Sequence, residues 1–233
     1  MKTLTYYIVL VLLISLGTSI ETRGNETIGK GFNKLPNFSE LLVQDYLDVE
    51  LVKANFFGVE QRKAEDGVVV KYLIKDEKLR LFSPRKNKFK KRVKVKVYLP
   101  YLFSLSMDDG SFLHSKDVFN FGHFVIGLNN AAVAKINLNA VRVDSYISNS
   151  SKLCLKGKCD RQIIYSDSSA RYAANRLETK HSEVYASNCA RVAICSKESL
   201  SGCSNNNANV IVRGTPVVDL FDKSSMGSLS MIK

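Results

Sequence analysis

The 233 residues predict a mainly β protein, an antiparallel sandwich or a strongly bent sheet, with one amphipathic helix near 169–186 and a disulfide-stapled C-terminal third. Three observations lead to this fold class. Apolar and polar residues alternate in many segments after residue 38, which is the pattern of half-buried strands. One later segment has helical spacing instead, and every cysteine follows residue 150. The composition, 45% hydrophobic and 24% charged, is that of an ordinary globular protein.

Residues 1–19 have the parts of a secretory signal peptide. Lys2 precedes a short apolar run, and the small residues Gly17 and Ser19 follow it. The run is shorter than the roughly 20 residues that cross a bilayer. We therefore expect cleavage after Ser19 and a secreted, extracellular protein. Residues 20–37 are polar and typical of a flexible lead-in.

Residues 38–150 are expected to form a β-rich domain. The clearest strand has Val93, Val95 and Val97 alternating with basic residues, so one side is buried and the other faces solvent or a ligand. The sequence Asn129-Asn130 is suited to a turn. No internal repeat period is evident. The expected strands are 48–52, 67–74, 78–82, 92–98, 119–128 and 131–147.

Residues 151–225 form a Cys-containing C-terminal part, which belongs to the same domain or to a small second one. The predicted helix lies here, because apolar residues recur at helical spacing after the capping sequence 166–169. Two more strands are expected at 209–212 and 217–221, followed by a tail over 226–233. The helical spacing connects Ala170, Ala173, Ala174, Leu177, His181, Val184 and Tyr185.

Two features of covalent chemistry agree with export. Asn25, Asn37 and Asn149 each begin an Asn-X-Ser/Thr triplet, the acceptor for N-glycosylation. In an oxidising compartment cysteines form disulfides. The first two cysteines bracket a Gly-containing loop and are expected to pair, and two of the other three could pair. The odd thiol would then be buried or bridge to a second chain. The cysteines are Cys154, Cys159, Cys189, Cys195 and Cys203.

The chain is basic, with 34 Lys and Arg against 22 Asp and Glu and a net charge of +12. Eight cations and no carboxylate lie between residues 85 and 96, and we call them the basic run. Lys78 and Arg80 would extend it if their strand paired with the following one as a hairpin. The basic run consists of Arg85, Lys86, Lys88, Lys90, Lys91, Arg92, Lys94 and Lys96.

Such a concentration of charge attracts polyanions outside the cell. We therefore expect a non-enzymatic protein whose basic run engages a polyanionic, sulfated glycan or the anionic lipid headgroups of a membrane surface. The alternative is that these lysines protect an edge strand from aggregation. Nucleic acid is a less favoured partner because no reading motif is present. The cysteine spacings match no zinc motif, and no metal or cofactor is expected.

Two other classes remain open from sequence. A secreted lipid carrier could use phenylalanines to surround an apolar cavity. A secreted basic hydrolase such as a ribonuclease could use His114-Ser115-Lys116, but the Asp that completes the related HxKxxxxD pattern is replaced by Phe121. The phenylalanines of the carrier interpretation are Phe56, Phe57, Phe112, Phe119, Phe121 and Phe124.

Overall fold

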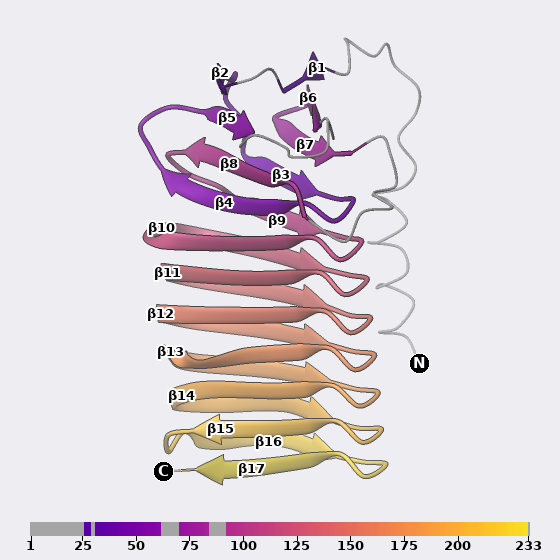
Figure 1. The fold of residues 1–233 in the computed structure, drawn as a ribbon. Coiled ribbons are helices and arrows are strands. Elements are labelled where there is room, and N and C mark those ends of the chain that lie inside the picture. The colour runs from indigo at the N-terminus through magenta and orange to yellow at the C-terminus, as the bar shows by residue number, and fades with distance from the viewer. Residues whose placement is uncertain (1–25, 29–30, 62–69, 84–91, 233) are drawn as a thin grey trace.

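The computed structural model describes residues 26–28, 31–61, 70–83 and 92–232, which form 17 strands and no helix. The chain winds into a β-solenoid of about seven turns, with the strands of successive turns stacked along one axis (Figure 1). No described segment is a helix capable of crossing a membrane.

Each turn of the solenoid has two straight sides, which we call face A and face B. In the C-terminal half one long strand supplies both. Within β14 (Arg191–Ser204), residues 191–195 pair with β15 (Asn209–Arg213), whereas residues 199–204 pair with β16 (Val217–Lys223). The strand therefore bends midway. Figure 1 shows these bends aligned along one side of the molecule, the kink edge, opposite the hairpin-like turns of the turn edge.

The two faces continue through the whole structure, and neighbouring strands are parallel except next to β5 and β6 at the N-terminal end. Face A contains, in spatial order, β2 (Gly31–Lys34), β5 (Gly58–Gln61), β8 (Lys94–Leu99), β4 (Asp48–Lys53), the first parts of β10 (Phe112–Leu128), β11 (Val133–Ile147), β12 (Lys152–Ser166), β13 (Arg171–Ala186) and β14, then β15 and β17 (Ser228–Ile232). Face B contains β1 (Glu26–Thr27), β6 (Lys71–Lys75), β7 (Lys78–Phe82), β3 (Glu40–Val43), β9 (Ser104–Met107), the second parts of β10 to β14, and β16.

A repeat of 18 to 20 residues underlies the C-terminal turns. Lys152 pairs with Arg171, Arg171 with Arg191, and Arg191 with Asn209. The same register stacks inward side chains into ladders between the two faces, and burying one such Leu or Val contributes about 1.5–3 kcal/mol. One inward ladder, at most 1% exposed at each position, consists of Leu113, Ala134, Leu153, Tyr172, Val192 and Val210.

The turn edge is built from two-residue turns. In the turn after β11, Asn149 and Ser150 have φ of 51° and 61°, and the Ser151 amide donates to the Ser148 carbonyl. Two consecutive left-handed residues define a type I′ turn, which favours Asn, Asp and Gly. The turn expected at Asn129-Asn130 is confirmed, one residue later, with positive φ at Asn130 and Ala131.

The expected antiparallel sandwich is wrong, and so is the helix at 169–186. A solenoid has two packed faces and the same two-residue alternation as a sandwich, so alternation alone does not separate them. Residues 171–186 form β13, in which Tyr172, Ala174, Leu177 and Thr179 point inward. The three-residue step from Ala174 to Leu177 occurs where the strand bends. That shift in phase produced the apparent helical spacing, and tertiary packing overrides the helix preference of alanine.

The expected disulfides are also wrong: all five cysteines are free. Cys154 and Cys159 lie on the same strand, β12. Cys154 points outward from face A, whereas Cys159 is buried beyond the bend of that strand, so the two thiols do not face each other as a disulfide requires. The other three are distributed over the fold, with Cys189 exposed at a turn, Cys195 buried and Cys203 half-buried.

Candidate anion-binding face

The described part of the basic run lies on face A. Lys94 and Lys96 point outward from β8, while Val95 and Val97 are buried, which confirms the strand expected there. The guanidinium of Arg92 lies over the ring of Tyr46 at 4.6 Å and donates to the Gly110 carbonyl, so it holds the turn edge together. The other five members, Arg85, Lys86, Lys88, Lys90 and Lys91, lie outside the described residues.

The proposed extension by Lys78 and Arg80 is wrong. Their strand, β7, lies on face B and pairs with β3 and β6, so it forms no hairpin with β8. Lys78 instead pairs with Glu40 at 2.8 Å, and the Arg80 guanidinium donates to Gln44.

A surface pocket of about 210 Å³ adjoins Lys94 and Lys96. The pocket brings part of the basic run together with His114 and Lys116. The sequence analysis assigned these two features to different functions. Strand β4 lies between them and supplies two carboxylates. The pocket is lined by Asp48, Glu50, Lys94, Val95, Lys96, His114 and Lys116.

The carboxylates of β4 neutralise much of the charge in this pocket. The Lys116 ammonium lies 2.8 Å from the Glu50 carboxylate, and its hydrogen bond lowers the Glu50 pKa more than burial raises it. Lys96 and His114 add to that lowering. Asp48 lies 3.8 Å from the His114 ring nitrogen, without a hydrogen bond between them. The pocket is therefore an ion-paired site rather than an isolated stripe of cations.

A second set of cations, which the sequence analysis missed, covers face A on the C-terminal side of the pocket. The face-A parts of β11 to β15 are residues 133–138, 152–157, 171–176, 191–195 and 209–213, and they contain no Asp or Glu. They contain seven cations, which we call the basic strip: Lys135, Lys152, Lys156, Arg171, Arg176, Arg191 and Arg213. All seven side chains are exposed. None forms an ion pair with a described carboxylate.

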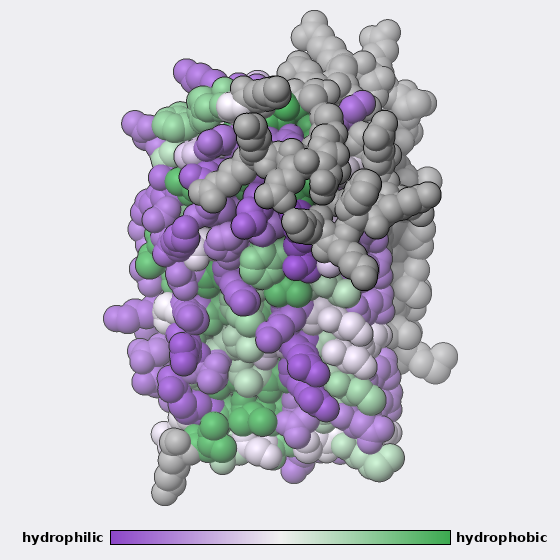
Figure 2. Space-filling view, viewed as in Figure 1, coloured by the Kyte–Doolittle hydropathy of each residue, from purple (hydrophilic) through white to green (hydrophobic). Residues whose placement is uncertain are grey.

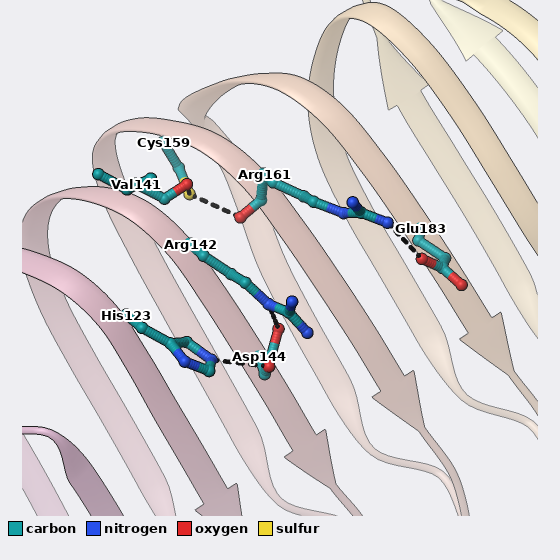
Figure 3. A network of polar contacts seen from close by, with 7 residues as sticks. All are labelled: His123, Val141, Arg142, Asp144, Cys159, Arg161 and Glu183. Carbon is teal, nitrogen blue, oxygen red and sulfur yellow. Dashed lines mark hydrogen bonds and ion pairs between the residues drawn. The ribbon is translucent and has the colours of Figure 1, made fainter.

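On face B at the same level, two arginines are paired with carboxylates. Asp144 is buried and accepts from both the Arg142 guanidinium and the His123 ring, each at 2.8 Å (Figure 3). On the next strand, Arg161 reaches Glu183 at 3.3 Å, and the Cys159 thiol donates to the Arg161 carbonyl (Figure 3). The two faces of these turns thus differ, because Arg142 and Arg161 on face B are paired with carboxylates, whereas the seven cations of the basic strip have no described carboxylate partner.

Three tyrosines stack beside this network on face B. The ring centroids of Tyr146 and Tyr165 are 5.1 Å apart, and those of Tyr165 and Tyr185 are 4.9 Å apart. The Tyr185 hydroxyl donates to the Glu183 carboxylate, which raises the Tyr185 pKa. The tyrosine ladder therefore lies beside the paired charges of Arg142 and Arg161 on face B.

The candidate glycosylation residues are only partly described. Asn37 is exposed just before β3, and Asn149 is exposed at a turn, where its amide donates to Asn129 at 2.8 Å. Asn25 lies outside the described residues.

The phenylalanines of the carrier interpretation occupy different parts of the fold. Phe119, Phe121 and Phe124 stack on one another within the core. Phe57 is buried in the N-terminal part, and Phe56 is exposed beside it. Phe112 lies on face A, where it stacks on His114. They therefore do not line a common cavity.

Three solved structures have the same fold. A putative adhesin from Bacteroides fragilis has a TM-score of 0.79 at 14% identity, covering 91% of this chain and 98% of that one. A putative adhesin from Parabacteroides merdae has a TM-score of 0.64 at 11% identity, covering 92% and 99%. A structure titled a putative lipid binding protein, from Parabacteroides distasonis, has a TM-score of 0.58 at 14% identity, covering 92% and 99%.

No curated protein matches the chain. Residues 37–216 match the family described as "Putative auto-transporter adhesin, head GIN domain". This range includes the pocket, the basic strip and most of the solenoid. Because it spans well over half of the sequence, the chain belongs to that family.

Proposed function

We propose that this protein is an exported, non-enzymatic binding protein that engages an anionic surface through face A. The observation that carries the proposal is the contrast between the faces. The basic strip has seven cations and no carboxylate, whereas the face-B parts of the same turns have Arg142 and Arg161 paired with Asp144 and Glu183. Lys94 and Lys96 of the basic run lie nearer the N-terminal end of face A, beside the carboxylates Asp48 and Glu50 of β4.

Family membership supports the coarse form of the proposal. The family is described as an adhesin head domain, and proteins with the same fold are titled adhesin or lipid binding protein. A role at a surface also agrees with the signal peptide expected over residues 1–19. Sulfated glycans and anionic lipid headgroups are both polyanions, and strand geometry concentrates the opposing charge well within one Debye length.

Charge reversal on face A tests the proposal. We expect the wild-type protein to bind heparin or phosphatidylserine vesicles with an affinity that falls steeply as salt rises. Arg171→Glu/Arg191→Glu should lower that affinity by about tenfold or more at physiological salt, because four units of charge change within a single patch. Lys94→Glu/Lys96→Glu reports separately on the contribution of the basic run.

The matched control is Lys75→Glu/Lys223→Glu, which makes the same change in net charge on exposed residues of face-B strands. It should retain binding. Equal losses in the control and the face-A variants would show that only net charge matters. Failure of the wild-type protein to bind either polyanion would reject the proposal.

A further inference from the structure

The basic strip has an internal geometry that points to the shape of its ligand. Lys152, Arg171 and Arg191 are register partners and form one row along the solenoid axis near the turn edge. Lys156 and Arg176 are register partners and form a second row nearer the kink edge. Neighbouring strands are about 4.8 Å apart, so the cations within a row recur at that interval.

Small side chains separate the two rows. Cys154, Ala173 and Ala193 are register partners halfway between them, and all three point outward. Lys152 and Lys156 are four residues apart on one strand, so the rows are roughly 13 Å apart at the backbone. Figure 2 shows a pale to green band running down this face between two purple bands.

We infer that this part of face A binds a linear polyanion, such as a sulfated glycan chain, lying along the solenoid axis between the two rows of cations. This inference rests on the proposed function and specifies its ligand. The chain would cross the strands at right angles and would rest on the three small side chains. Sulfate or carboxylate groups would then meet cations on three neighbouring strands on one side and on two neighbouring strands on the other. Arg171, Arg176 and Arg191 can each bind such a group with two parallel hydrogen bonds.

A membrane fits this part of the surface less well. Between Val133 and Ile194 on face A, no large apolar side chain is exposed, and only Ile211, 37% exposed, lies beside the rows on the next strand. One such side chain offers little to insert among lipid chains. Long cationic side chains on both sides of the small residues would also keep a flat bilayer away from the central row. A single polymer chain can occupy the space between them.

The test changes the shape of the surface between the two rows without changing its charge. Ala173→Tyr/Ala193→Tyr fills the central row and leaves all seven cations in place, and outward strand positions accept aromatic residues. Heparin oligosaccharides of increasing length, from the disaccharide upward, should bind the wild-type protein with rising affinity. The affinity should reach a plateau once the oligosaccharide is as long as the rows. The variant should bind the longer ones about tenfold more weakly.

Ser201→Tyr places a tyrosine on the outward side of face B, and this control should bind as the wild type does. Circular dichroism and thermal unfolding establish that each variant is folded. Wild-type affinity in the tyrosine variant would overturn the inference, because the cations would then act only as a diffuse field.

Two other outcomes separate this inference from the proposed function. Binding to phosphatidylserine vesicles without binding to heparin would reject the linear ligand. It would still agree with the proposed function, which is engagement of an anionic surface. Loss of heparin binding in Lys94→Glu/Lys96→Glu, but not in Arg171→Glu/Arg191→Glu, would move the site to the pocket and also overturn the inference. Binding to neither probe would reject both proposals.

Discussion

Gly157 packs directly on the backbone of Leu138 in the preceding turn of the solenoid. A Cβ added at Gly157 would lie 1.8 Å from the Leu138 carbonyl oxygen, and the φ of Gly157 is 123°. The residue therefore combines a left-handed backbone with no room for a side chain. Gly202 repeats this relationship against Val184.

Replacing Gly157 by alanine should destabilise the protein. We expect a loss of at least about 2 kcal/mol in the free energy of unfolding, from backbone strain and the displacement of Leu138. Urea unfolding measures the loss. Gly122→Ala is the control, because nothing lies within 4 Å of its added Cβ. Equal stability of the two variants would contradict the close packing of neighbouring turns.

The carboxylate of Asp167 should make stability depend on pH. Burial raises its pKa, but hydrogen bonds from Ser187, Ser168 and Asn188 outweigh burial, so the net shift is downward from 3.8. A lowered pKa in the folded state stabilises the protein above the unfolded-state pKa. That contribution disappears as pH falls through the lower, folded-state value.

Ser187→Ala removes a 2.6 Å hydrogen bond to Asp167 and should cost about 0.5–1 kcal/mol near neutral pH. The difference from wild type should shrink in acid, where the carboxyl is protonated in both proteins. Thermal unfolding across the acid range measures this effect. Ser224→Ala, at the equivalent position of a later turn, should show no such dependence. A Ser187→Ala deficit that stays constant with pH would argue against the role of Asp167.

The cysteines should react with iodoacetamide in an order set by burial. Cys189 is exposed and should be modified first in the native protein. Burial raises the pKa of Cys159 to about 12, so its thiol stays protonated and unreactive. Cys195 is buried as well. Mass spectrometry of the denatured, unreduced protein should find all five cysteines modified, and fewer would indicate a disulfide.

The tyrosine ladder should contribute through contacts between turns. Tyr165 stacks on both Tyr146 and Tyr185, so Tyr165→Ala removes two ring contacts and Tyr146→Ala removes one. Each aromatic pair contributes about 0.5–1.5 kcal/mol beyond the burial of its area. Chemical unfolding should therefore find Tyr165→Ala the less stable variant by about that amount. Equal losses would mean that the rings pack without coupling.

Several strands could be predicted from sequence because their alternation is local. Val93, Val95 and Val97 alternate with basic residues and are buried in or beside β8, as expected. Which strands pair could not be predicted in this way, because pairing depends on the turns that join them. The sequence pattern that reveals the repeat lies in the turns. Small residues follow the left-handed pair at regular intervals, as Ala132, Ser151, Ala170, Ala190 and Ala208 show.

The candidate site was predicted only in part, for a related reason. The basic run is contiguous in sequence and so was easily found, but Asp48 and Glu50 lie beside it only after folding. The rows of the basic strip show the opposite relationship, because their members are distant in sequence and close in the structure. Lys152, Arg171 and Arg191 are isolated in sequence and become neighbours only through the repeat. Reading the chain in steps of about 19 residues would have brought them together.

The register that joins each turn to the next also has a mechanical consequence. In a solenoid each turn rests on its two neighbours, so its stability is approximately a sum of nearest-neighbour terms. Tension applied along the axis at the C-terminal end would load the pairing of β17 with β15 first, and then each earlier turn in succession. Single-molecule pulling should therefore peel the strands away one turn after another, with each step releasing about one repeat of chain.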